Sequence, residues 1–358
     1  MSLDSRSLKP LAWSIICCWM IVTLLSVQST AEVNTVAGEG NFPAGKNMLA
    51  VPLAVTLCDA ASLEESYRGD FLKNFKTLQQ GDRNWLYRNM DLKRAYGPKQ
   101  PGYKNLQQLQ QALQLRGTTL VMVPIPGRAL IHPEFLGAID YDVQRGRKSY
   151  SNYLQQLRNI KIVVPNIDSL FEQTHNKPMF FARDHHWNHH GARTIARLTA
   201  HSIKAQKAYS GIEKQLFTSV SVGNDHNQGS LQRAAWTLCQ QSFPKEPFKR
   251  YKTVAAGPED LFGELPEPQI VLVGTSNSSG RLKFNFEGFL AHYVGAAVDN
   301  KAQSGGGFGG ALKDYLSSQA FKQSPPKVLV WEIPGYYSLN DQAFFDDLLQ
   351  RLGVSLSI

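Results

Sequence analysis

The sequence predicts a layered α/β protein built on a mainly parallel β-sheet. Short runs dense in Val, Ile and Leu recur along the chain between turn residues, as is typical of buried parallel strands. Stretches with helical spacing of apolar residues lie between these runs. Because strands and helices alternate, we expect helices to pack against the sheet.

The expected elements follow one another in a regular order. Strands are short and apolar, whereas helices carry polar residues between their apolar ones. Residues 210–250 show only weak periodicity, and no element is assigned to them. Strands are expected at 119–125, 160–164, 270–273 and 328–333, and helices at 106–115, 150–157, 192–207 and 284–293.

The first 31 residues differ from the rest of the chain. Arg6 and Lys9 precede an apolar run over residues 11–27, and a small-x-small pattern follows at 29–31. This order is typical of a secretory signal peptide, and an uncleaved signal anchor is the alternative. Gly- and Pro-rich breaks further along do not divide the chain into distinct halves, so one exported domain is expected over residues 32–358.

The formal net charge is +9, which favours an anionic partner. For an exported protein, an acidic polysaccharide or an envelope surface suits this charge better than nucleic acid. The chain has no basic run interleaved with aromatic residues of the kind that single-stranded nucleic acid requires. A scattered, solvated surface charge is the alternative interpretation.

Two cysteines lie in the body of the chain, Cys58 and Cys239, while Cys17 and Cys18 lie in the leader. In an oxidising compartment this pair indicates one disulfide, which would close a very long loop. Two unrelated buried thiols are the alternative. Neither cysteine lies near a motif that indicates catalysis.

The segment 183–192 contains the first candidate catalytic residues. Asp184 and His186 stand two residues apart before an expected helix, for which Asn188 is a suitable N-cap. At this spacing the carboxylate can orient the imidazole as a general base. In the alternative interpretation, Asp184 only caps a turn and His186 is a buried histidine with its hydrogen bonds satisfied.

The candidate nucleophile is Ser276, directly after the strand expected at 270–273. Ligand crevices of open α/β sheets lie at the carboxyl ends of strands. The Ser276 N–H is the first candidate oxyanion donor, and Thr275 and Asn277 are further candidates for oxyanion or substrate contacts. Taken alone the motif is weak, because Gly, Thr and Ser are common in turns.

Three further residues are candidates for substrate contacts. Gly306 lies in a glycine-rich stretch that offers a backbone N–H or space for a sugar, although a flexible turn explains it equally well. Tyr337 follows the last expected strand and would stack on a sugar ring, or else line the core. Arg281 would steer an acidic polymer, or else is ordinary surface charge.

The histidine-rich segment also permits a metal site. His185 and His189, like His186 and His190, are four residues apart, with Asp184 adjacent. The zinc-protease pattern needs a Glu directly after the first His, and none is present. We therefore expect no metal and no cofactor, and keep a metal-dependent hydrolase as an alternative.

Several motifs together resemble one family. They are the Asp-x-His-Trp run at 184–187, Gly-Thr-Ser at 274–276 and the segment 285–290, with further matches at 81–87, 123–134 and 331–334. In order and spacing they are similar to the alginate O-acetyltransferases of the AlgX and AlgJ type, which are SGNH-hydrolase-like proteins. The match spans most of the chain after the leader.

The resemblance implies a three-layer α/β/α domain in the periplasm that transfers acetyl groups onto hydroxyls of alginate or a comparable secreted polysaccharide. Ser276 would carry the acetyl group, His186 would act as base and Asp184 would hold His186. The acetyl donor would come through a membrane-bound O-acyltransferase, and other polysaccharide secretion proteins would be partners. Cys58 and Cys239 match the cysteine pair of the family.

Two departures from the family pattern affect these expectations. The chain ends soon after Tyr337, so we expect no C-terminal carbohydrate-binding module of the AlgX type. Thr275 stands where ordinary SGNH hydrolases have Asp. An acetylesterase that uses water as acceptor, and a noncatalytic scaffold for polysaccharide export, are the alternative functions.

Overall fold

The computed structural model describes residues 55–173, 175, 177–256 and 268–354. All of them lie in one compact unit, Gly45–Ile358. The expected leader falls outside the described residues, and the domain boundary at residue 32 stays a prediction. Within the described ranges, no helix combines the length and the apolar character needed to cross a bilayer.

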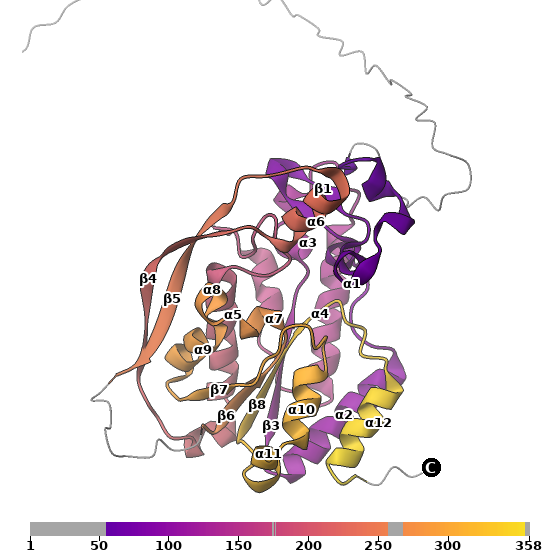
Figure 1. Ribbon diagram of the computed structural model, residues 1–358. Coiled ribbons are helices and arrows are strands. Elements are labelled where there is room, and N and C mark those ends of the chain that lie inside the picture. The colour runs from indigo at the N-terminus through magenta and orange to yellow at the C-terminus, as the bar shows by residue number, and fades with distance from the viewer. Residues whose placement is uncertain (1–54, 174, 176, 257–267, 355–358) are drawn as a thin grey trace, which may run out of the picture. The chain divides into compact units, whose positions relative to one another are not determined.

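The centre of the fold is a four-stranded sheet (Figure 1) of β3 (Thr119–Ile125), β6 (Ile270–Val273), β7 (Val298–Asn300) and β8 (Val328–Pro334). The strand order is β3-β8-β6-β7, and all neighbours are parallel. Every residue of β6 and β8 is buried. Three of the expected strands are thus confirmed, with β8 one residue longer than expected.

The strand expected at 160–164 is wrong in extent. Only Val163 pairs with the sheet, through a parallel bridge to Val121. The residues before it close the preceding helix, where the Ile162 N–H donates to the Leu157 carbonyl at 3.1 Å. Because residues 160–162 belong to the end of this helix, too few residues of the apolar run remain to pair with the sheet as a strand.

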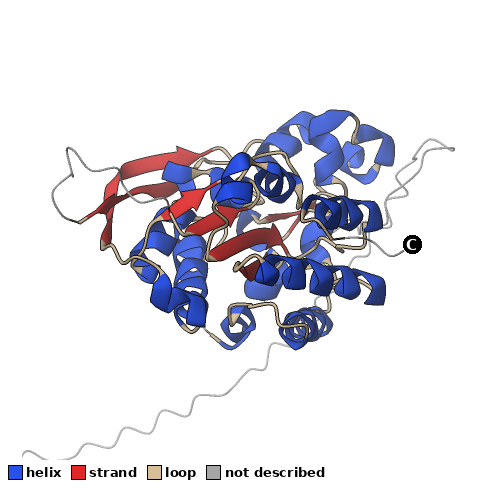
Figure 2. Ribbon diagram, turned by 90° about the horizontal axis from the view of Figure 1, so that it is seen from below, coloured by secondary structure: helices blue, strands red, loops and turns tan. Residues whose placement is uncertain are grey.

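Helices lie on both sides of the sheet (Figure 2), which confirms the three-layer α/β/α class. The four expected helices are present as α2 (Gln100–Leu115), α4 (Val143–Asn159), α5 (His189–Lys204) and α9 (Phe286–Val294). Asn188 caps α5 as expected, because its side chain accepts from the N–H groups of His190 and Gly191. Besides short 3-10 helices, the other α-helices in the described residues are α1 (Gly69–Leu72), α3 (Arg128–Ile131), α6 (Ser230–Cys239), α7 (Ser276–Ser279), α8 (Arg281–Phe284), α10 (Gly310–Ser317), α11 (Gln319–Gln323) and α12 (Gln342–Arg351).

The region of weak periodicity forms a long antiparallel ribbon, β4 (Phe217–Asn227) and β5 (Glu246–Ala255), with α6 between its strands. Most of β4 is exposed, so its sequence lacks the alternation of a half-buried strand. The ribbon contacts α8 and α9, and its buried end, Asn227, reaches the candidate site. A second short ribbon pairs β1 (Gln79–Gln80) with β2 (Leu86–Tyr87).

A disulfide joins Cys58 to Cys239 at the end of α6, which confirms the pairing expected from the sequence. The two cysteines are 181 residues apart in the chain. The bond therefore links the first described segment to the element that follows β4.

Replacing both cysteines by serine is expected to lower the free energy of unfolding by about 2–5 kcal/mol, because an unfolded chain without the cross-link gains the freedom of a very long loop. Urea unfolding of oxidised wild type and of the double serine variant measures the difference. Reduction of the wild type should reproduce it. Equal midpoints in all three samples would show that the bond does not stabilise the fold.

Candidate active site

The candidate nucleophile lies where β6 turns into α7. Gly274 and Thr275 connect the strand to Ser276, the first residue of the helix. Thr275 caps α7, since its hydroxyl accepts from the Asn277 N–H at 3.3 Å. Gly274 is required at the turn, because a Cβ there would lie 2.6 Å from a carboxylate oxygen of Glu332.

Glu332 on β8 holds this turn in place through hydrogen bonds. Its fully buried carboxylate accepts the Thr275 N–H at 2.8 Å, the Thr275 hydroxyl at 3.0 Å and the Ser278 hydroxyl at 2.8 Å. Burial raises the pKa of Glu332 from its ordinary value of 4.5 to about 7. Glu332 was not among the site residues expected from the sequence, although an acid inside an apolar strand is a signal for a specific role.

The raised pKa of Glu332 predicts a specific pH dependence of stability. Between pH 4.5 and 7 the folded protein holds a proton on Glu332 that the unfolded chain releases. The stability that this proton contributes is therefore complete below pH 4.5 and is lost as the pH rises through 7. Glu332→Gln mimics the protonated carboxyl at every pH. We expect the stability of the wild type relative to this variant to fall by about 2–3 kcal/mol from pH 5 to 8 in urea unfolding. Parallel curves would contradict the prediction.

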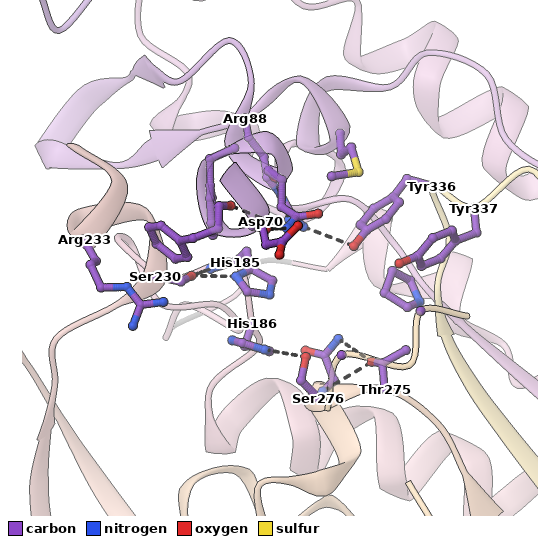
Figure 3. A pocket seen from close by; sticks show the side chains of 18 residues that line it. Asp70, Arg88, His185, His186, Ser230, Arg233, Thr275, Ser276, Tyr336 and Tyr337 are labelled. Atoms are coloured by element: carbon purple, nitrogen blue, oxygen red, sulfur yellow. Dashed lines mark hydrogen bonds between the residues drawn. The ribbon is translucent and has the colours of Figure 1, made fainter. Parts of the chain in front are cut away.

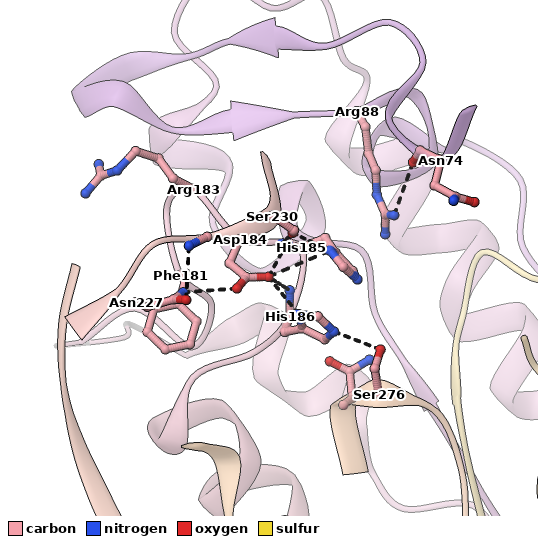
Figure 4. Close-up of polar contacts among 12 residues, drawn as sticks. Asn74, Arg88, Phe181, Arg183, Asp184, His185, His186, Asn227, Ser230 and Ser276 are labelled. Atoms are coloured by element: carbon pink, nitrogen blue, oxygen red, sulfur yellow. Dashed lines mark hydrogen bonds and ion pairs between the residues drawn. The ribbon is translucent and has the colours of Figure 1, made fainter. Parts of the chain in front are cut away.

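His186 lies between the candidate nucleophile and Asp184 (Figure 4). Its Nε2 is 2.8 Å from the Ser276 Oγ, and its Nδ1 is 2.6 Å from Oδ1 of Asp184. The Trp187 indole N–H donates to the Asn277 carbonyl at 3.0 Å. This bond ties the loop that carries His186 to α7 and so helps to fix the distance between the candidate base and the candidate nucleophile.

Asp184 is held as a buried carboxylate. It is 2% exposed and accepts from Asn227 at 3.0 Å, Ser230 at 3.0 Å and Lys283 at 2.9 Å, besides His186. Burial raises the pKa of Asp184, but His186 and Lys283 outweigh it and hold this pKa well below its ordinary value. Asp184 is therefore ionised throughout the neutral range.

The site opens into a cavity of about 470 Å³ (Figure 3), within the range of about 300–1,000 Å³ that ligand pockets span. Ser276 and His186 lie on one wall, and the other lining side chains include aromatic residues, arginines and the carboxylate of Asp70. Arg88 is fixed there, donating to the Tyr336 hydroxyl at 3.2 Å. The cavity is lined by Asp70, Phe71, Asn74, Phe75, Arg88, Met90, His185, His186, Ser230, Arg233, Thr275, Ser276, Asn277, Gly305, Gly307, Pro334, Tyr336 and Tyr337.

The structure brings most of the sequence-derived candidates to this cavity. Thr275, Asn277 and Tyr337 line it beside Ser276. Gly306 is not among the lining residues, although the glycines on either side of it are. Arg281 lies outside the lining, with an exposed side chain whose Nε is 3.5 Å from Glu287.

The residues around Asp184 were not found from the sequence. Asn227 comes from β4, Ser230 from the start of α6 and Lys283 from α8. Two of these elements belong to the region without periodicity. Single Asn, Ser and Lys residues outside a recognisable motif carry no signal that distinguishes them from surface residues.

One group of side chains in the described part of the chain has the spacing of metal ligands, namely Asp184, His185 and His186, whose ligand atoms lie within 4.8 Å of one another. His189 and His190 are not part of this group, so it contains neither of the i, i+4 histidine pairs that the sequence suggested. His186 Nδ1 and Asp184 bond to each other. A metal at this position would displace the hydrogen bond that orients the candidate base.

These features define a class of protein. A serine at the carboxyl end of a parallel strand, bonded to a histidine that is bonded to an aspartate, in a three-layer α/β/α domain, is typical of SGNH-hydrolase-like domains. Residues 78–335 match the family described as "SGNH hydrolase-like domain, acetyltransferase AlgX". The chain belongs to this family.

Curated relatives include the alginate biosynthesis protein AlgX of Pseudomonas aeruginosa, 35% identical over 82% of this chain and 63% of the relative. AlgX of Azotobacter vinelandii is 33% identical over 87% of this chain and 65% of its own length. The probable alginate O-acetylase AlgJ of Pseudomonas aeruginosa is 28% identical over 72% of this chain and 69% of AlgJ. The chain thus spans less than two thirds of these two AlgX relatives.

Two solved structures share the fold. The structure of Pseudomonas aeruginosa AlgX superposes with a TM-score of 0.76 at 33% identity, over 82% of this chain and 70% of that one. The O-acetyltransferase domain of Pseudomonas putida AlgJ gives a TM-score of 0.63 at 23% identity, over 77% of this chain and 98% of that one.

Proposed function

We propose that this protein transfers acetyl groups onto hydroxyls of alginate or a comparable acidic polysaccharide through an acetyl-serine intermediate on Ser276. The observation that carries the proposal is the 2.8 Å contact of Ser276 Oγ with His186 Nε2 on the wall of a cavity. Membership in the AlgX family, with relatives named for alginate biosynthesis and O-acetylation, supports the substrate and the reaction.

The first half-reaction loads the acetyl group. As Ser276 Oγ attacks the carbonyl carbon of the donor ester, His186 Nε2 takes the hydroxyl proton. Asp184 holds the Nδ1–H of the imidazolium that forms. The tetrahedral intermediate collapses, the bond from the acetyl carbon to the donor breaks, and the donor leaves with the proton from His186.

The second half-reaction transfers the acetyl group to the sugar. A sugar hydroxyl gives its proton to His186 Nε2 while its oxygen attacks the acetyl carbon of the intermediate. When the new ester forms, the bond to Ser276 Oγ breaks and this oxygen recovers the proton. Water in place of the sugar would release acetate, so transfer depends on a bound acceptor and an acyl group shielded from water.

The developing oxyanion needs donors at the same turn. We assign the Ser276 N–H as the first donor. The second is the side-chain amide of Asn277, which lines the cavity; it donates one proton to the Thr275 hydroxyl at 3.3 Å and keeps a second proton for the oxyanion. Thr275 acts differently, because its hydroxyl is bonded to Glu332 and holds the turn in place. Tyr337 and the glycine-rich stretch around Gly306 are the proposed contacts to the acceptor.

The protein would work in the periplasm on a polymer under secretion. The disulfide Cys58–Cys239 suits an oxidising compartment, and the net charge of +9 suits an acidic polymer. The acetyl donor would arrive through a membrane-bound O-acyltransferase, and other secretion proteins of the polysaccharide would be partners. The expected leader would direct the export.

The test follows both products of the reaction by mass spectrometry. Purified protein is given an activated acetyl ester with deacetylated alginate oligosaccharides, and acetylated sugar and acetate are measured together. A serine-directed acyl probe is applied in parallel, and the labelled peptide is identified. We expect acetylated sugar and a label on Ser276. A label with acetate alone would favour an esterase, and no label would favour a scaffold.

A further inference from the structure

A second histidine faces the cavity beside the candidate base. His185 lines it between Ser230 and the open space (Figure 3). Its ring packs on that of His186, with centroids 3.8 Å apart. The Nδ1 of His185 lies 2.5 Å from the Ser230 hydroxyl. His185 has no role in the proposed acetyl transfer.

The hydrogen bonds around Ser230 fix the tautomer of His185 (Figure 4). The Ser230 hydroxyl has one proton, and it donates this proton to Oδ1 of Asp184 at 3.0 Å. A buried carboxylate accepts only, and it is a stronger acceptor than a neutral imidazole nitrogen. The Ser230 oxygen must then accept from His185 Nδ1–H, which leaves the Nε2 of His185 without a proton.

The ring also stays neutral. Burial and the neighbouring His186 lower the pKa of His185 well below its ordinary value. The side chain is 20% exposed, and in the described part of the chain Nε2 has no hydrogen-bond partner. It therefore presents an unshared electron pair to the cavity, which attracts a hydroxyl donor and repels a carboxylate.

We propose that His185 Nε2 accepts a hydrogen bond from a second hydroxyl of the acceptor sugar, next to the hydroxyl that gives its proton to His186, so that the acceptor is a vicinal diol. This inference rests on the proposed transfer to sugar hydroxyls. The rings of His185 and His186 pack with their centroids 3.8 Å apart, and both residues line the same cavity, so that one acceptor sugar can lie against both rings. Ser230 is the positioning residue that holds the tautomer.

The test compares acceptors within one protein. Methyl mannuronoside is offered beside its 2-deoxy and 3-deoxy forms, with an activated acetyl ester as donor. The readout is the ratio of kcat/KM for the diol to kcat/KM for each deoxy form, in which any change in serine acylation cancels. The wild type should prefer the diol by roughly tenfold, the worth of one hydrogen bond to a neutral group.

His185→Phe should bring this ratio close to one, because phenylalanine keeps an aromatic ring packed against His186 and loses the nitrogen that accepts the hydrogen bond. Ser230→Ala should lower it partly, because the tautomer is then free. His201→Phe, on an exposed position of α5, is the matched control and should keep the wild-type ratio. A wild-type ratio of one, or the same ratio in His185→Phe as in the wild type, would overturn the inference.

The tautomer is measured independently of transfer. Nitrogen-15 NMR of histidine-labelled wild type and His185→Phe identifies the resonances of His185, and we expect a protonated Nδ1 and a bare Nε2. A protonated Nε2 would overturn the inference even if the enzyme were active. If the wild type acetylates none of the mannuronosides, the proposed function fails on this substrate class, and with it the acceptor role of His185.

Discussion

Replacing Ser276 with alanine is expected to lower acetyl transfer to alginate oligosaccharides by about 10⁴- to 10⁶-fold. Loss of a nucleophile removes the covalent route altogether, and the remaining rate comes from substrate binding and oxyanion stabilisation. Acetylated sugar and released acetate, both followed by mass spectrometry, should fall together. Since the serine is only partly buried, the variant should unfold within a few degrees of the wild type.

The same short segment offers a matched control. Ser279 lies one turn further along, and its hydroxyl bonds to Ser304 at 2.7 Å rather than to the histidine. Ser279→Ala should transfer acetyl groups at nearly the wild-type rate. Acetyl transfer that persists in Ser276→Ala, or that is lost equally in both variants, would show that the nucleophile is another group.

The three longer strands of the central sheet were predictable from the sequence. The runs that form β3, β6 and β8 are almost wholly apolar, with Glu332 as the one charged residue, because helices cover both faces of the sheet. The ribbon of β4 and β5 was not, since β4 is exposed over most of its length and carries no periodic pattern. The position of this ribbon is set by its contacts with α8 and α9. These contacts join residues that are distant in the sequence, so no local pattern indicates them.

The candidate site residues could be selected from the sequence to a similar degree. Asp184, His186 and Ser276 stand in two short motifs with recognisable spacing and expected neighbours. The groups that support them come from distant positions, as Glu332 does for the serine turn and Lys283 for the aspartate. A single acidic or basic residue has no local pattern, so only the folded structure shows which charge it meets.

Asp184→Asn is expected to lower turnover by about 10⁴-fold, the cost found when the acid of such a triad becomes an amide. The two oxygens of Asp184 face donors only, from His186, Ser230, Asn227 and Lys283. An amide would place its NH₂ group against one set of these donors and would remove the charge that stabilises the imidazolium. The measurement is the rate of serine acylation together with the rate of acetyl transfer.

Asp168 provides the control for this substitution. It pairs with Arg158 at 3.5 Å and lies outside the cavity lining, so Asp168→Asn should keep both rates. The role of Asp184 is tested by comparing how far the substitution lowers the rate of acylation and the rate of transfer. Because His186 takes a proton in each half-reaction, acylation and transfer should fall by similar factors. If only transfer fell, Asp184 would act on the acceptor and not on the base.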